Sequence, residues 1–133
     1  WSAPRLAADD PDAHLEHGNW MVYSHGGTKK TGKEFYAWAR EAVNLGAGEI
    51  LFTSMNHDGT NQGFACEALA QLSQSVSVPV IASGGAGTMQ HFSDVFQYGN
   101  ADAALAASVF HYGNISVSGL KQYLNEQGVS VRL

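Results

Sequence analysis

Hydrophobic residues follow two alternating patterns along most of the chain. In some segments they recur every three or four residues, as in an amphipathic helix, and in others they form short unbroken runs, as in strands buried on both faces. The helical spacing predicts helices over 33–45, 67–75, 89–98 and 117–127, and the unbroken runs predict strands over 49–54, 78–83 and 103–108. Strand and helix therefore alternate through the C-terminal part of the chain.

This alternation predicts an α/β fold with a parallel sheet, because each helix returns the chain to the start of the next strand by a right-handed crossover. The first part of the chain differs. The turn-forming residues within 1–19 predict an irregular loop, with a weak strand at 2–8 as an alternative for that part. The pattern over 20–32 predicts a loop excursion. No low-complexity linker interrupts the sequence, so we predict one domain over residues 1–133.

Composition narrows the classes of function. The 133 residues are 44% hydrophobic, enough for a core, but a complete (β/α)8 barrel needs about 250 residues. A net charge of −5 argues against nucleic acid as the main partner, since backbone phosphates attract clustered Lys and Arg. Cys66 is the only cysteine, which suits the reducing cytosol, and no apolar run approaches the ~20 residues of a membrane helix.

Glycines and small residues follow two successive predicted strands. Ser83, Gly84 and Gly85 open a turn whose backbone can approach a ligand closely, and amides near a helix start favour a phosphate. Ala107 and Ser108 end the next strand and leave room for the same ligand. The loops after the last two strands of (β/α)8 enzymes commonly bind phosphate. The alternative is a tight turn whose glycines only satisfy backbone geometry.

A polar segment follows the first of the three clear strands. Thr53 and Asp58 are candidates to face a substrate, with Asp58 as a hydroxyl-orienting group or proton carrier, and Gly59 and Thr60 are candidate phosphate donors. Asp-Gly is also an ordinary turn pair, and a loop histidine such as His57 is commonly a bystander. The other histidines lack metal-ligand spacing, so we expect neither a metal nor a cofactor.

Several of these segments together resemble one known family. The segments that carry the resemblance are 46–51, 53–54, 58–60, 79–87 and 101–111, within a match over about residues 18–133. They resemble the cyclase subunit of imidazole glycerol phosphate synthase, from histidine biosynthesis. The resemblance implies a (β/α)8 TIM-type barrel, of which this chain covers the second half.

The family resemblance also implies an activity and the residues that serve it. The family takes ammonia from a glutaminase partner and converts a phosphoribulosyl aminoimidazole carboxamide nucleotide into imidazole glycerol phosphate. Glu49 would belong to a charged gate near the glutaminase docking face, and Asp58 would have a supporting catalytic role. The residues implied around the substrate and its phosphate are Thr53, Gly59, Thr60, Ser83, Gly84, Gly85, Ala107 and Ser108.

The sequence departs from the family pattern in its first strand. The family uses two catalytic aspartates, on the first and fifth barrel strands, and the fifth-strand aspartate is expected just before 10–12, near the place where Leu6 stands. Asp9 could substitute for it only after a shift in register. The first strand and the second phosphate site belong to the other half of the barrel. We therefore expect phosphate binding with little or no cyclase activity by the isolated chain. The alternatives are an active cyclase component, completed by a second copy or an N-terminal half, and a non-catalytic, truncated fold fragment.

Half a barrel leaves a strand edge and an apolar face uncovered. Two copies with a C2 interface would cover them, whereas a flattened, flavodoxin-like sheet would cover the face with helices of its own. We expect a homo-oligomer, because the N-terminal strand is poor in the β-branched residues that protect an edge.

Overall fold

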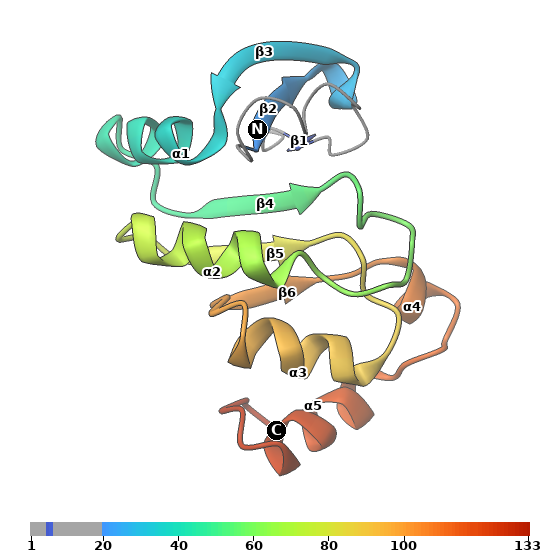
Figure 1. Cartoon of the computed structure of the whole chain (residues 1–133). Helices are drawn as coiled ribbons and strands as arrows, with labels where there is room; N and C mark the ends of the chain where they lie inside the picture. The colour runs from blue at the N-terminus through green and yellow to red at the C-terminus, as the bar shows by residue number, and fades with distance from the viewer. Residues whose placement is uncertain (1–4, 7–19) are drawn as a thin grey trace.

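The computed structural model describes residues 5–6 and 20–133, which form a mixed sheet and five helices (Figure 1). The strands are β1 (Arg5–Leu6), β2 (Met21–Ser24), β3 (Lys29–Glu34), β4 (Ile50–Ser54), β5 (Val80–Ser83) and β6 (Ala103–Leu105). The helices are α1 (Phe35–Asn44), α2 (Cys66–Ser75), α3 (Met89–Gln97), α4 (Ser108–His111) and α5 (Val117–Glu126), with a 3-10 turn at His25–Gly27. The irregular loop expected over 1–19 lies outside the described residues, apart from β1, which falls within the weak strand expected at 2–8.

The sheet has the order β3-β2-β1-β4-β5-β6. Strands β1, β4, β5 and β6 are parallel, which confirms the α/β fold with a parallel sheet. The sequence correctly placed β4, β5 and the four longer helices, with ends shifted by a few residues. Strand β6 ends at Leu105, three residues earlier than expected, because the chain turns there into the short helix α4.

The loop excursion expected over 20–32 is wrong. β2 and β3 form an antiparallel hairpin that extends the sheet beyond β1. The apolar residues of β2 are buried, and Thr31 Oγ1 donates to the carbonyl of Val22 across the hairpin, 2.6 Å away. Almost every residue of β3 is polar and exposed, so this edge strand has the composition of a loop, and only its pairing with β2 makes it a strand.

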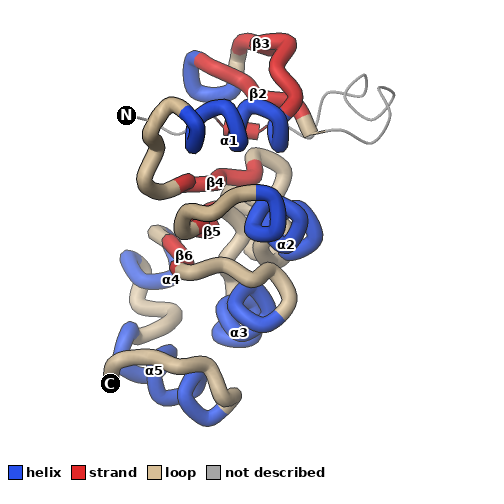
Figure 2. Tube along the Cα trace, turned by 90° about the vertical axis from the view of Figure 1, so that its left-hand side faces the viewer, coloured by secondary structure: helices blue, strands red, loops and turns tan. Residues whose placement is uncertain are grey.

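One layer of helices packs on one face of the sheet. α2 and α3 lie side by side over β4–β6 (Figures 1 and 2), and α1 and α5 extend the layer by contacting α2 and α3 respectively. Phe52 of β4 is 1% exposed at the centre of the core, with its ring centroid 5.0 Å from that of Phe35 in α1. α1 starts at Phe35 because the Glu34 carboxylate accepts from the amides of Tyr36 and Ala37.

The opposite face of the parallel strands is only partly covered. The register places Leu51, Ile81 and Ala103 in one row across this face, and Thr53, Ser83 and Leu105 in the next. Most of these side chains are half-exposed, and Leu105 is 47% exposed. A flavodoxin-like sheet needs a second helical layer here, and the described residues form none. They instead form a one-sided half-barrel, meaning β1, β4, β5 and β6 with the helices packed on them.

None of the helices in the described ranges combines the length and the apolar character needed to cross a membrane.

Candidate functional site

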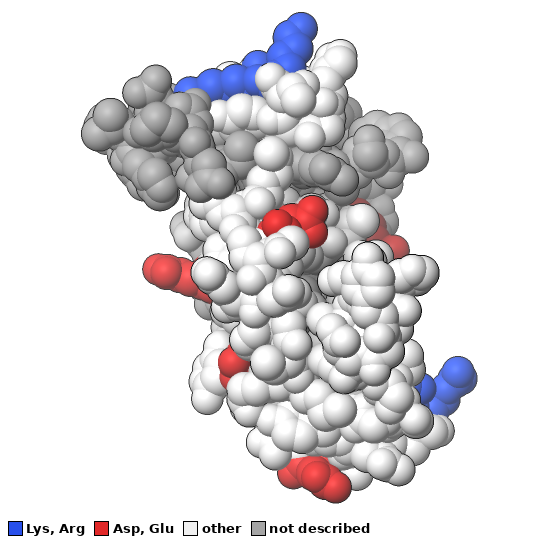
Figure 3. Space-filling view, turned by 90° about the vertical axis from the view of Figure 1, so that its right-hand side faces the viewer, with Lys and Arg blue, Asp and Glu red and all other residues white. Residues whose placement is uncertain are grey.

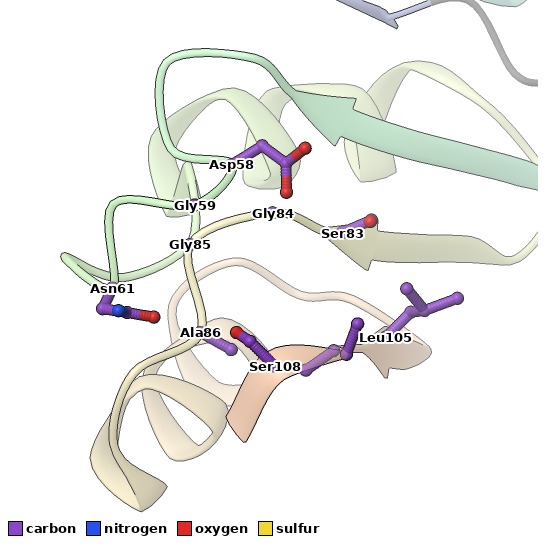
Figure 4. A pocket seen from close by; sticks show the side chains of 11 residues that line it. Asp58, Gly59, Asn61, Ser83, Gly84, Gly85, Ala86, Leu105 and Ser108 are labelled. Carbon is purple, nitrogen blue, oxygen red and sulfur yellow. The ribbon is translucent and has the colours of Figure 1, made fainter. Parts of the chain in front are cut away.

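The loops after β4, β5 and β6 meet at one edge of the sheet and enclose a cavity of about 260 Å³ (Figure 4). They meet because parallel strands in register end at the same edge. Seven residues singled out from the sequence line the cavity: Asp58, Gly59, Ser83, Gly84, Gly85, Ala107 and Ser108. The structure thus brings together one carboxylate, two hydroxyl-bearing residues and the backbone of three turns.

The other three residues singled out from the sequence lie outside the cavity lining. Thr53 points to the partly covered face of β4, in register with Ser83. Thr60 is exposed, and its hydroxyl donates to the carbonyl of His57, 2.8 Å away. Glu49 is exposed and precedes β4, so it lies at the opposite end of the strand from the cavity.

The turn after β5 accepts only glycine at two positions. Gly84 and Gly85 have φ of +90° and +106°, a region that other residues rarely adopt. A Cβ on Gly84 would lie 2.8 Å from the carbonyl oxygen of Ser54, and one on Gly85 would overlap the carbonyl of Gly63. The glycines therefore let the β5 loop lie against the β4 loop, and they leave its backbone facing the cavity.

In the same turn, two buried residues have backbone amides that donate to no acceptor in the described part of the chain. Gly85 and Ala86 are buried and line the cavity, and neither amide donates to any loop, cap or side-chain acceptor there. The next two amides, of Gly87 and Thr88, both donate to Nδ1 of His91, at 3.1 and 3.3 Å. Since buried amides rarely remain unpaired, Gly85 and Ala86 are the amides left for a ligand. The start of α3 is already capped by His91.

The cavity offers uncharged donors rather than cations. No Lys or Arg is among the described residues that line it, and its one charged group is Asp58. Figure 4 shows the Asp58 carboxylate on the side of Ser83, whereas Asn61 and Ser108 extend from the opposite side. Figure 3 views the edge where the parallel strands end, and Lys and Arg lie towards the ends of this face, away from its middle. Any anion bound here would be held by amides and hydroxyls.

Hydrogen bonds tie the β4 loop to the end of its strand. Ser54 is fully buried, and a hydrogen bond of 2.8 Å joins its Oγ to Nδ1 of His57. The carbonyl of Ser54 also accepts from the amide of Asp58, and the carbonyl of His57 accepts from the amide of Thr60. Burial lowers the pKa of His57, so the imidazole is neutral at neutral pH.

The remaining perturbed groups lie away from the cavity. Burial, with Glu34 and Glu67 nearby, raises the pKa of Tyr36 to about 12. Burial and Asp94 raise the pKa of the Cys66 thiol, which makes it a poor nucleophile at neutral pH. Within the described ranges, no three His, Cys, Asp or Glu side chains gather closely enough to hold a metal ion.

Four further residues line the cavity: Asn61, Ala86, Leu105 and Ala106. Ala86 and Ala106 lie in the small-residue segments that the sequence singles out, whereas sequence reasoning missed Asn61 and assigned no ligand role to Leu105. Of these, Asn61 is the one with a polar side chain, and its φ of +57° turns the chain back towards the β5 loop. Asn adopts this left-handed conformation more readily than most residues, so the Gly-Thr-Asn run after Asp58 was a usable signal. Ala86 and Ala106 contribute through their backbone and small size.

Comparison with known proteins gives consistent matches. The sequence model of a family described as "Histidine biosynthesis protein" matches residues 7–116. The chain is 62% identical over 121 residues to the imidazole glycerol phosphate synthase subunit HisF of Elusimicrobium minutum, a match that covers 91% of this chain and 48% of that protein.

Two further relatives carry the same name. The HisF subunit of Flavobacterium psychrophilum is 59% identical over 122 residues, covering 92% of this chain and 49% of the relative. The HisF subunit of Geobacillus thermodenitrificans is 61% identical over 115 residues, covering 86% of this chain and 46% of the relative. The chain thus spans about half the length of the curated relatives it matches.

Replacing Gly85 by alanine should destabilise the fold more than replacing Gly59. Both have positive φ, which by itself costs about 1–3 kcal/mol for another residue, but only at Gly85 does the added Cβ also meet backbone atoms, those of Gly63. Urea unfolding followed by circular dichroism measures both variants against the wild type. Equal losses of unfolding free energy would show that the β5 and β4 loops do not lie in contact as described.

Proposed function

The chain belongs to the family of histidine biosynthesis proteins, which have the TIM-barrel fold, and we propose that its cavity binds the phosphate group of a small molecule. The observation that carries the proposal is the pair of backbone amides of the buried residues Gly85 and Ala86, which have no acceptor among the described residues. Phosphate oxygens are acceptors of the right charge, and oriented backbone amides form concave sites for anions. The hydroxyl of Ser108 and the amide of Asn61 supply side-chain donors from two other loops.

The substrate class follows from the name of the relatives. They are subunits of imidazole glycerol phosphate synthase, so we propose a phosphorylated imidazole precursor of the histidine pathway as the ligand. Asp58 lies at the side of the cavity next to Ser83, where a sugar or nucleotide portion beyond the phosphate would lie. A supporting catalytic role for Asp58 is therefore part of the proposal, with Thr53 on the adjoining face.

The isolated chain should bind the phosphorylated ligand without catalysing the cyclase reaction. The family pattern expects an acidic residue near the position of Leu6, whose backbone pairs with Ser54 at the carboxyl end of β4. Within the described residues, β1 ends without an acid, and one positioned acid or base contributes about 10²- to 10⁴-fold to rate.

A second proposal concerns partners and rests on the partly covered face of the half-barrel. Leu51, Ile81 and Leu105 expose apolar surface there, which a second copy of the chain would bury. We propose a homo-oligomer assembled through this face, and the same face would accept an N-terminal half-barrel. Glu49, at the opposite end of β4, remains the proposed gate residue towards a glutaminase subunit.

Inorganic phosphate titrated into the chain should bind with a dissociation constant of about millimolar, since uncharged donors alone hold it. Asn61→Asp and Ser108→Asp each place a carboxylate in the lining and should weaken binding about tenfold or more by charge repulsion. Ser118→Asp, on the exposed surface of α5, is the matched control and should leave the affinity unchanged. Isothermal titration calorimetry measures all four proteins. No heat of binding by the wild type, or equal weakening by the control, would contradict the proposal.

Pure chain supplied with ammonia and the nucleotide substrate should show no cyclase rate above background. Leu6 stands in place of one of the two aspartates that the resemblance implies, so Leu6→Asp should raise the rate above that of the unmodified chain. A coupled absorbance assay of product formation measures both. A substantial ammonia-dependent rate from the unmodified chain would overturn the expectation of binding without turnover.

Leu105→Lys should shift the chain from an oligomer towards a monomer. Burying a lysine ammonium in an apolar interface costs several kcal/mol, whereas the same change at Leu45, exposed at the end of α1, removes no interface contact. Static light scattering over a range of concentrations measures the mass of the wild type and of the Leu105→Lys and Leu45→Lys variants. A monomeric wild type at high concentration would contradict assembly through this face.

A further inference from the structure

The end of β4 carries a hydrogen-bonded pair that does not itself line the cavity. Ser54 Oγ and His57 Nδ1 lie 2.8 Å apart, and Ser54 is 0% exposed. Ser54 shares the core-facing side of β4 with Phe52, so its position is fixed by the packed core. The side chain of His57 is thus hydrogen-bonded to a residue whose position is set by core packing.

His57 lies at the junction of two walls of the cavity. The residues that follow it, Asp58 and Gly59, form one wall. Its own Cβ lies 3.0 Å from where a Cβ on Gly85 would be, so its side chain starts directly against the β5 turn that forms the other wall. A shift of His57 would therefore change the separation between the Asp58–Gly59 backbone and the Gly85 amide.

Further hydrogen bonds connect His57 and its neighbours to the rest of the loop. The carbonyl of Ser54 accepts from the amide of Asp58 at 2.9 Å, which closes a turn over 55–57. The carbonyl of His57 accepts both from the amide of Thr60 at 3.1 Å and from its hydroxyl at 2.8 Å. The Ser54–His57 bond is the one side-chain bond among these that links the loop directly to the buried strand.

We propose that His57 is a positioning residue, held by Ser54, that sets the distance between the β4 and β5 walls and thereby the affinity for phosphate. The inference rests on the proposed phosphate site, and it adds to that site two residues that do not touch the ligand. His57 is neutral in this role, so it contributes a hydrogen bond and not a charge. An asparagine can replace it, because its amide group reaches the position of the imidazole Nδ1.

The test compares Ser54→Ala, His57→Ala, the double variant and His57→Asn with the wild type by calorimetric titration of inorganic phosphate. Loss of one hydrogen bond that positions the loop should weaken binding about threefold to tenfold in either alanine variant. The double variant should lose no more than either single variant, because both remove the same bond. His57→Asn should recover most of the affinity. Ser75→Ala is the matched control, since it removes a serine hydrogen bond to the Leu72 carbonyl far from the cavity, and it should bind like the wild type.

A second readout separates failure of this inference from failure of the proposed function. The backbone amide resonances of Gly59 and Gly85 in ¹⁵N-labelled protein should move in His57→Ala and stay near their wild-type positions in His57→Asn. If the wild type binds phosphate and both alanine variants bind equally well, or if asparagine fails to restore binding, the positioning role is wrong. If the wild type binds no phosphate, the proposed function fails, and unchanged amide resonances in His57→Ala would overturn the positioning role as well.

Discussion

Parallel pairing of β4, β5 and β6 in strict register is the constraint on which the site depends. It places Thr53, Ser83 and Leu105 side by side, so the three chains leave the sheet at one edge and their loops must share one space. The register is held from the other face, where Phe52, Val80 and Ala82 pack into the core under α2 and α3. A slip of one strand by one residue would turn its core-facing side chains to the partly covered face of the sheet. It would also separate the Gly84–Gly85 turn from the β4 loop that it contacts.

Much of this architecture was predictable from hydrophobic periodicity, because buried strands and one-sided helices leave unambiguous patterns. The hairpin was not, since β3 is an edge strand whose exposed lysines and threonine read as loop. Its strand character comes from pairing with the buried residues of β2, a tertiary cause that composition does not record. The early end of β6 has a similar origin, because alanines suit a strand end and a turn equally well.

The site was predictable where its chemistry depends on backbone conformation. Glycines at 84 and 85 are required by positive φ and close packing, and that requirement is visible in the sequence. What the sequence concealed is which amides remain available. His91 caps α3 by accepting from Gly87 and Thr88, so the donors left for a ligand lie earlier in the turn, at Gly85 and Ala86. Similarly, His57 looks like a bystander until its contact with buried Ser54 is known.

The location of the cavity explains how, in such a fold, anion binding and acid–base catalysis can depend on different strands. The residues that line the cavity come from the loops after β4, β5 and β6, so these strands and their helices suffice to build it. The resemblance implies a catalytic aspartate at the end of β1, where this chain has Leu6 in register with Ser54 of β4. An anion site made from backbone amides would not depend on distant strands, because its geometry is local. A reaction that needs two acids on opposite sides of a barrel depends on the whole sheet, since closure of the sheet sets the spacing of the acids.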